Sequence, residues 1–451
     1  MELLNNMKSE KSLRQKILSL AFPAILENVL HTAVWMVDTA MVGRLSAAAL
    51  SAVGFGTQVA FALVHIFGAI GIGTSALVAR YVGAGQPKDA NRVVAQSFLV
   101  STIISVLIAI ANIYIGIPLL SAVIEDPAVV SLGVIYVRII TIGVVAMIPA
   151  MVMNAALRGA GNTRLPMVSA FIANTFNIIA DYVLIFGHFG FPQMGVRGAA
   201  IATALAQIIG ATITLLYLLM GKDIIKLDLK QAFRVDIDIL KQLSRLSLPS
   251  CLEEFVHSGS RIVSSIWIAS LGTVSLAAHQ VAHSAESMSF MPGYGFQVAA
   301  STLVGQNLGA DRPDEAEKSG WKTMQLAVLF MGAVGLFFLL FSYPLMGLFT
   351  NVKEVREVAA ICIRIAAFEQ PTVAICMSLA GALRGAGDTR GTFKVGIISN
   401  YLIRIPSLYL VIFVLKKPIN YVWMAIVFQF LVQATLTMLR FKQGIWKKIK
   451  V

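Results

Sequence analysis

Twelve long hydrophobic segments follow one another along the chain, and a short polar segment separates each from the next. A run of about 20 apolar residues is long enough to cross the hydrocarbon core of a bilayer as an α-helix. The pattern therefore predicts an all-α polytopic membrane protein with twelve transmembrane helices. We place these helices at residues 17–40, 49–79, 93–118, 131–156, 165–187, 198–220, 246–270, 275–305, 323–350, 358–382, 394–415 and 420–440.

The composition agrees with this interpretation. Hydrophobic residues make up 57% of the chain and charged residues only 13%, whereas about a quarter of the residues in soluble domains are charged. The basic start is not followed by a short apolar stretch with a cleavage site, so we expect no removable signal peptide. The net charge of +13 is spread over the loops, so it does not predict nucleic-acid binding.

Basic residues concentrate in alternate loops, which predicts the orientation of the chain. They precede the first segment, follow the last one and fill the even-numbered loops, as Arg80, Lys88 and Arg390 illustrate. Lys353 and Lys416 lie in odd-numbered loops and depart from the pattern. We expect a multi-pass protein of the cell membrane with both termini in the cytoplasm.

An internal repeat divides the chain into two similar halves. The sequence ALRGAGNTR at 156–164 recurs as ALRGAGDTR at 382–390, and the same offset of 226 positions relates 75–90 to 301–316. Six helices per half give both halves the same orientation, related by a pseudo-twofold axis along the membrane normal. We predict a six-helix lobe at 1–221, a cytoplasmic linker at 222–245 and a second lobe at 246–451.

Ionisable residues inside the first and seventh segments form matching polar stripes. Glu27, His31 and Asp38 are spaced i, i+4 and i+11, which places them within roughly 40° of one another around a helix. Glu253 and His257 repeat the first two positions. Such groups are costly in hydrocarbon and are functional candidates by default. The alternative is a buried structural ion pair between each glutamate and a histidine or arginine.

Further polar residues lie in the other segments of the first half. Asn177 and Asp181 share a face of the fifth segment, Thr203 lies in the sixth, and Tyr136 and Asn154 lie in the fourth. Together with Asp38, these carboxylate, amide and hydroxyl oxygens suit a hard monovalent cation or an exchangeable proton. The C-terminal counterpart of Asp181 is Ser407, so the halves share architecture but not chemistry.

The eighth segment carries His279, His283 and Glu286 on one face. Its HQVAH sequence resembles the zinc-protease pattern HExxH, but Gln280 replaces the catalytic glutamate. An intramembrane enzyme is therefore a weak alternative, and we expect helix packing or cavity lining instead.

Three further features bear on a substrate cavity. Met288 and Met291 are candidates for lining a cavity for flat apolar cations, because methionine surfaces adapt to varied shapes. Glu369 beside Pro371 indicates a bend in the tenth segment, and Pro23 lies where the first helix can kink.

Several sequences together resemble the multidrug and toxic compound extrusion (MATE) family. They are MVDTAMVGRL at 36–45, the two ALRGAG(N/D)TR loops and LAAHQVA at 276–282. The resemblance covers nearly the whole chain. It implies twelve helices in two lobes and export of amphipathic, mostly cationic small molecules, driven by inward Na⁺ or H⁺.

The resemblance also implies roles for individual residues. The family's coupling-cation site corresponds here to Asp38, Asn177, Asp181, Thr203, Tyr136 and Asn154, and Pro23 corresponds to the proline where the first helix bends. The C-lobe cation ligands of the NorM branch correspond to His257 and Val373, so only the N-lobe set matches, as in the DinF and archaeal branches. Candidates for a substrate site or a second titrating site are Glu27, His31, Glu253, His257, Met288 and Met291.

These inferences lead to a transporter and not an enzyme. We expect no cofactor and no resident metal, and a monomer whose partners are small amphipathic cations and the lipid bilayer. A lipid-linked sugar flippase of the same superfamily is the main alternative, because Arg261, Arg364 and Arg404 offer cations for a pyrophosphate. The sequence does not distinguish Na⁺ from H⁺, since the same oxygen ligands serve both.

Overall fold

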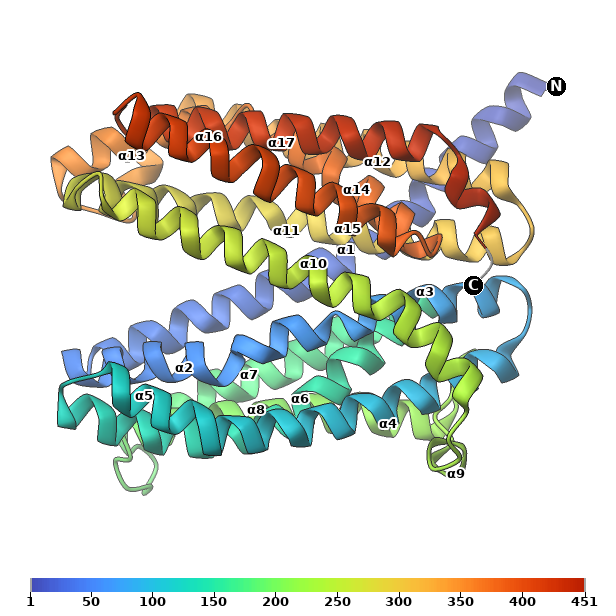
Figure 1. Ribbon diagram of the computed structural model, residues 1–451. Coiled ribbons are helices and arrows are strands. Elements are labelled where there is room, and N and C mark those ends of the chain that lie inside the picture. Colours follow the sequence, from blue (N-terminus) through green and yellow to red (C-terminus); the bar gives the residue numbers. More distant parts are fainter. Residues whose placement is uncertain (1, 450–451) are drawn as a thin grey trace. The chain divides into compact units, whose positions relative to one another are not determined.

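Helices form nearly all of the computed structural model (Figure 1), which describes residues 2–449 without the side chains of residues 2–11 and 65. No β-strand occurs in this part of the chain. The α-helices are α1 (Glu2–Gly43), α2 (Ala47–Gly68), α3 (Ile70–Gly83), α4 (Pro87–Ala111), α5 (Ile117–Val123), α6 (Pro127–Ala160), α7 (Arg164–Phe186), α8 (Val196–Met220), α9 (Leu229–Ala232), α10 (Ile237–Ala269), α11 (Thr273–Gly309), α12 (Pro313–Met346), α13 (Lys353–Ala366), α14 (Gln370–Gly385), α15 (Thr389–Ile397), α16 (Ile405–Tyr409) and α17 (Ile419–Lys442). Short π-helical turns, η1 (Asn112–Gly116), η2 (Ile398–Arg404) and η3 (Leu410–Val414), join α4 to α5 and extend α15 and α16, and a 3-10 turn, η4 (Ile445–Lys448), follows α17.

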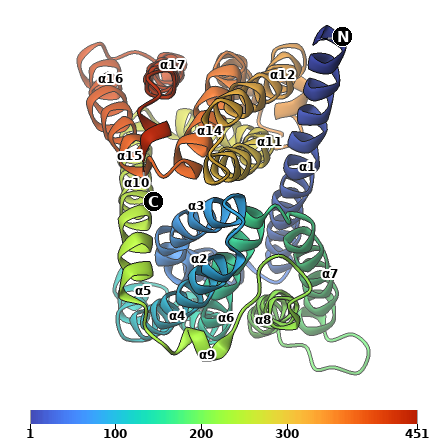
Figure 2. The same ribbon diagram turned by 90° about the vertical axis from the view of Figure 1, so that its right-hand side faces the viewer.

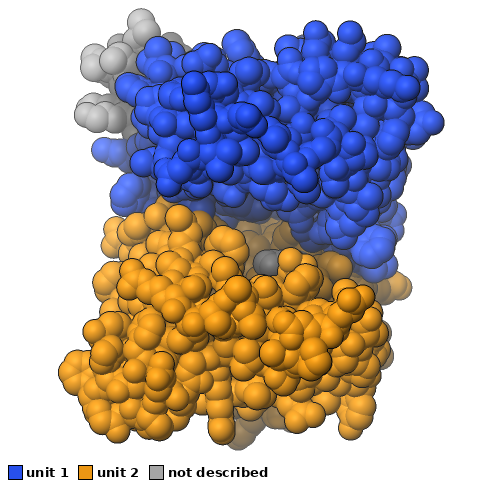
Figure 3. Space-filling view, turned by 90° about the vertical axis from the view of Figure 1, so that its left-hand side faces the viewer, with its two compact units in different colours: residues 1–25, 83–85, 248–451 blue, residues 26–82, 86–247 orange. Residues whose placement is uncertain are grey.

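The chain divides into two compact units, coloured separately in Figure 3. Unit 2 comprises residues 26–82 and 86–247, and unit 1 comprises 1–25, 83–85 and 248–451. Six membrane-length segments belong to each. Those of unit 2 are α1, α2–α3, α4–α5, α6, α7 and α8, and those of unit 1 are α10, α11, α12, α13–α14, α15–η3 and α17. The predicted all-α fold with two six-helix lobes is confirmed.

The boundaries of the units fall inside α1 and α10, unlike the predicted division at residues 222–245. Ile17 and Leu20 of α1 belong to the hydrophobic core of unit 1 together with Phe296. In unit 2, Ser247 of α10 donates a hydrogen bond to the backbone oxygen of Ile70 at 3.3 Å. Much of the predicted linker is therefore ordered helix that packs with unit 2.

Close helix packing forms the core of unit 2, where α6 contacts both α2 and α8. Tyr136 and Ile140 of α6 are buried among Ala49 of α2 and Ala199 of α8. Small residues permit this approach, because a Cβ atom on Gly143 would lie 2.9 Å from the Cα atom of an alanine in α8. The polar side chains of α1, α6 and α7 are thereby held in a rigid apolar bundle.

The core of unit 1 surrounds α11 and α14, which Figure 2 shows almost along their axes. Phe296 and Ala299 of α11 are buried against Val373 of α14. A second cluster joins Ala282 of α11 to Trp423 of α17. The polar residues of α11 therefore lie on a helix with packed neighbours on several sides.

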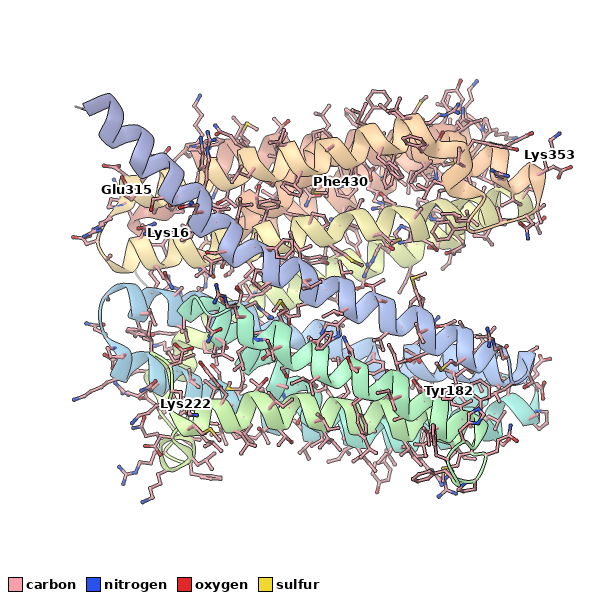
Figure 4. The ribbon with its side chains drawn as sticks, turned by 180° about the vertical axis from the view of Figure 1, so that it is seen from behind. Lys16, Tyr182, Lys222, Glu315, Lys353 and Phe430 are labelled. Atoms are coloured by element: carbon pink, nitrogen blue, oxygen red, sulfur yellow. The ribbon has the colours of Figure 1, made fainter. Side chains whose placement is uncertain are left out.

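Nine of the described helices are long and apolar enough to cross a membrane, or ten if the bent pair α13–α14 counts as one span. The predicted spans at 246–270 and 275–305, which became α10 and α11, are not among them. Figure 4 shows Lys16 and Glu315 at one end of unit 1 and Lys353 at the other.

The bend predicted beside Pro371 is confirmed, because α13 and α14 meet at 52° around Glu369. In contrast, α1 continues as one helix through Pro23, and α10 continues through Pro249. The hinge role of Pro23 stays a prediction.

Both copies of the ALRGAG(N/D)TR sequence fold alike. Gly161 and Gly387 adopt left-handed backbone conformations, with φ of 95° and 90°, which end the preceding helix. The next residues, Asn162 and Asp388, each accept a hydrogen bond at 3.1 Å from the amide three residues later. The sequence repeat is therefore also a structural repeat.

Candidate functional site

Two aspartates face each other inside unit 2. The carboxyl group of Asp38 on α1 lies within interaction distance of that of Asp181 on α7. The side chain of Asp181 is fully buried, and that of Asp38 is partly buried. No described group donates a hydrogen bond to either oxygen of Asp181 or to Oδ1 of Asp38.

The Asp38–Asp181 pair requires a positive charge to balance its two carboxyl groups. A carboxylate oxygen only accepts hydrogen bonds, so two ionised carboxylates cannot bond to each other. An uncompensated charge buried in a protein costs several kcal/mol. A proton between the two groups, or a small cation bound to their oxygens, would remove both problems.

A tyrosine and a threonine extend the polar cluster. Tyr136 of α6 lies near both aspartates and is 5% exposed. Its hydroxyl accepts a hydrogen bond from Thr57 of α2 at 3.2 Å. The ring fits there because Gly56 lacks a Cβ atom, which would lie 2.8 Å from Cδ1 of the tyrosine.

One amide lies beside the pair. Asn177, one turn before Asp181 on α7, contacts that aspartate, but its Nδ2 atom has no partner in good hydrogen-bonding geometry within the described chain. Asn174, a further turn away, also has an unpartnered Nδ2 atom. The structure therefore brings together Asp38, Asp181, Asn177 and Tyr136 of the predicted set.

The other two members of the predicted set have different partners. Thr203 donates its hydroxyl hydrogen to the backbone oxygen of Ala199 in its own helix, at 3.0 Å. Asn154 accepts a hydrogen bond from Thr214 at 3.0 Å. Neither contact involves the aspartates, so a role for Thr203 or Asn154 in cation binding stays a prediction.

The glutamates of the two polar stripes, Glu27 and Glu253, form buried ion pairs with the arginines of the repeated ALRGAG sequences. Arg158 donates to Glu27 at 3.0 Å in unit 2, and Arg384 donates to Glu253 at 2.9 Å in unit 1. Glu253 also accepts a hydrogen bond from Thr392 at 3.0 Å. Of the two interpretations that the sequence left open, the ion pair with arginine is the one the structure contains.

Comparison with known proteins assigns the family. The family model described as MatE matches residues 23–183 and 249–410, which together cover most of the chain. The chain belongs to the MatE family. The relatives of this MATE transporter include "Probable multidrug resistance protein NorM" of Thermotoga maritima, 32% identical over 97% of this chain and 94% of that protein. Multidrug resistance protein MdtK of Yersinia pestis is 28% identical over 88% and 87% of the two chains.

Solved structures share the fold of this MATE transporter. The Vibrio cholerae MATE transporter VcmN superimposes with a TM-score of 0.90 at 20% identity, covering 97% of this chain and 98% of that one. A MOP superfamily transporter from Pyrococcus furiosus gives a TM-score of 0.89 at 22% identity and covers 97% of both chains. Together with the helices of membrane-spanning length, the family places this transporter in the plasma membrane as a multi-pass protein.

The remaining candidate residues for a substrate site or a second titrating site lie outside the aspartate cluster of this MATE transporter. His31 lies near the ion pair of α1, and His257 lies near the ion pair of α10. Met288 is half-exposed on α11, whereas Met291 is buried. The roles of His31, His257, Met288 and Met291 in a substrate site or a second titrating site stay predictions.

Sequence reasoning missed Thr57, Arg158 and Arg384 as partners of the polar residues. The residues three and four positions before and after Thr57 are all apolar, so no polar stripe on its helix distinguishes it. The two arginines had a usable signal, because each stands 131 positions after its glutamate. That equal spacing in both halves is visible in the sequence and favours pairing each glutamate with its arginine.

Proposed function

We propose that this MATE transporter is a cation-coupled antiporter that exports amphipathic, mostly cationic small molecules by alternating access. The observation that carries the proposal is the Asp38–Asp181 pair, whose buried oxygens lack hydrogen-bond donors in the described chain. The names of the NorM and MdtK relatives support drugs as the exported class.

In this mechanism an external cation neutralises the pair. Sodium would take oxygen ligands from Asp38, Asp181 and Tyr136, whereas a proton would lie between the two carboxyl groups. Either ion removes the repulsion between α1 and α7 and so changes which conformation is favoured. Coupling requires only that the cation and the drug prefer different states. Each charge moved inward supplies about 2.3 kcal/mol per 100 mV of membrane potential.

The proposal includes a topology. Both termini lie in the cytoplasm, in agreement with the alternation of basic loops. In the proposed antiport, the cation enters from the outer face of the membrane, and the exported molecule leaves by that same face.

The arginines on which a flippase would depend are engaged within unit 1. Arg261 pairs with Glu254 at 3.7 Å, and Arg364 donates to Ser342 at 2.6 Å. Arg404 lies near two buried glutamates. Because Arg261 and Arg364 have protein partners and Arg404 has two acidic neighbours, no observation favours a pyrophosphate-binding cavity over the antiporter.

The test is efflux of ethidium from proteoliposomes under separately imposed sodium and pH gradients. We expect one of the two gradients to accelerate efflux. An ionophore that dissipates that gradient should abolish the acceleration. Equal rates with either gradient and with none would contradict cation coupling. Efflux that responds to one gradient only would also identify the ion.

A further inference from the structure

A second pair of acidic residues lies inside unit 1, at positions that the proposed function does not use. Glu286 is on α11, and Glu369 precedes α14 at the 52° bend between α13 and α14. The side chain of Glu369 is fully buried, and that of Glu286 is almost fully buried. Their carboxyl groups lie close enough to interact directly.

The pair has cationic and titratable neighbours on three elements. His283 of α11 contacts Oε2 of Glu286 through Nδ1 at 3.1 Å, and the ring of His279 stacks on that of His283 at 5.9 Å. Arg404 of η2 lies near both glutamates, and Arg261 of α10 lies near Arg404. No other titratable or charged group of the described chain interacts with the two carboxyl groups.

Several buried polar atoms around the pair have no hydrogen-bond partner among the described residues. They include both carboxyl oxygens of Glu369, Nδ1 of His279 and Nε1 of Trp423. Trp423 lies 5.5 Å from His279 between ring centroids, and both side chains are more than nine-tenths buried. Since buried polar groups are normally satisfied, the two orphaned oxygens of Glu369 indicate a ligand that brings a hydrogen-bond donor to this carboxyl group.

The charges of the cluster identify that ligand. Two ionised carboxylates beside Arg404 leave one negative charge when the histidines are neutral, and a single proton cancels it. The carboxyl–carboxyl contact becomes a hydrogen bond only when one group carries a proton, because a carboxylate oxygen cannot donate. Burial of two like charges at this separation also favours holding one proton between them.

We propose that Glu286 and Glu369 bind one exchangeable proton, which reaches them through His283. Half of the His283 side chain is exposed, at 46%, whereas that of Glu286 is 5% exposed. The imidazole is therefore the exposed end of a short path to the buried pair.

This site has no counterpart in unit 2. The positions 226 residues before Glu286 and Glu369 hold Ala60 and Gly143, and those 226 residues after Asp38 and Asp181 hold Ser264 and Ser407. Each unit thus carries its own acid pair at unrelated positions. The proton site is separate from the proposed coupling site and does not depend on drug export.

The test uses infrared difference spectra of the full-length purified protein, recorded between acidic and alkaline buffer in H₂O and D₂O. We expect a carboxylic-acid carbonyl band in the wild type that shifts in D₂O, is lost in Glu369→Gln and Glu286→Gln, and persists in Asp181→Asn. Unchanged bands in both glutamine variants would overturn the proposal. Loss of the band in Asp181→Asn alone would also overturn it, by assigning the proton to the other unit.

Two further variants separate proton binding from folding and from access. Glu369→Asp keeps a carboxyl group, so a carbonyl band should return at a shifted frequency, and its absence from a folded Glu369→Asp protein would count against the pair. His283→Gln should retain the band but slow its deuterium exchange by about 10²-fold. An exchange rate equal to that of the wild type would remove His283 from the path.

Discussion

Arg158, in the last turn of α6, donates hydrogen bonds to both carboxylate oxygens of Glu27 on α1, at 3.0 and 3.3 Å. Arg384 makes the same ion pair with Glu253 on α10. The side chains of both glutamates are almost completely buried. In each unit, therefore, the arginine of the repeated ALRGAG sequence holds the first helix of the repeat to the fourth.

Removing one member of this ion pair should destabilise unit 2 more than removing both. Glu27→Gln removes the carboxylate that balances the Arg158 charge, and we expect a loss of about 3 kcal/mol. The double variant Glu27→Gln/Arg158→Met removes that charge and should recover part of the loss. Thermal unfolding in detergent gives the comparison, and simple additivity of the two single losses would contradict a coupled pair.

The glycines next to these arginines should not tolerate a methyl group. A Cβ atom on Gly159 would lie 3.0 Å from the Cα atom of Ser75, and one on Gly385 would lie 2.7 Å from that of Ser301. Because backbone must move in both cases, alanine at either position should cost about 1–3 kcal/mol. The measurement is the melting temperature of each variant.

Gly332 of α12 is the matched control for these substitutions. A Cβ atom there meets no described atom within 4 Å. Gly332→Ala should be neutral or stabilise the helix by up to about 1 kcal/mol, since alanine has the higher helix propensity. Similar losses for Gly332→Ala and Gly159→Ala would show that close backbone contact is not the cause.

Much of this architecture could be predicted from local pattern. Hydrophobic runs in the sequence predict the twelve segments, and a fixed offset between similar sequences predicts the repeat. Pro371, close to Glu369, predicts the bend. The spacing within α7 also placed Asn177 and Asp181 on one face, where the structure has them beside each other.

What could not be predicted are contacts between helices distant in sequence. Glu286 and Glu369 were each recognisable as unusual residues inside a membrane segment, but helical spacing says nothing about which segments pack together. The unit boundaries inside α1 and α10 were missed for the same reason. Thr203 satisfies its hydroxyl within its own helix, an option open to any helical threonine that composition does not reveal.

The loop before α10 should detach from α4 at low pH. Partial burial raises the pKa of Asp236, but hydrogen bonds from the Ile239 backbone amide and from Arg92 outweigh it and hold that pKa below its ordinary value. A carboxylate with a lowered pKa stabilises the fold above its unfolded-state pKa of about 3.9 and loses this effect as pH falls further.

Asp236→Asn tests this dependence. The variant should melt below the wild type near neutral pH by the equivalent of about 1 kcal/mol, and the difference should vanish as the pH falls below about 3.9. Melting curves across this range provide the measurement. A difference that stays constant with pH would contradict an ionic contribution from Asp236.

The hydroxyl of Tyr136 should contribute to cation affinity. Tyr136→Phe keeps the ring against Gly56 but removes the oxygen near the aspartates, so the cation concentration for half-maximal efflux should rise about tenfold, as loss of one hydrogen bond or ligand predicts. Tyr182→Phe is the control, because Tyr182 is a half-exposed neighbour of Asp181 on α7. Equal affinities in the two variants would exclude Tyr136 from the site.

The most direct test measures gradient-driven ethidium efflux by Asp38→Asn and Asp181→Asn proteoliposomes, beside the exposed control Glu354→Gln. If the two aspartates share the coupling cation, each asparagine variant loses its response to the gradient while Glu354→Gln responds like the wild type. Full gradient-driven efflux in both aspartate variants would show that the buried pair does not couple transport to the cation.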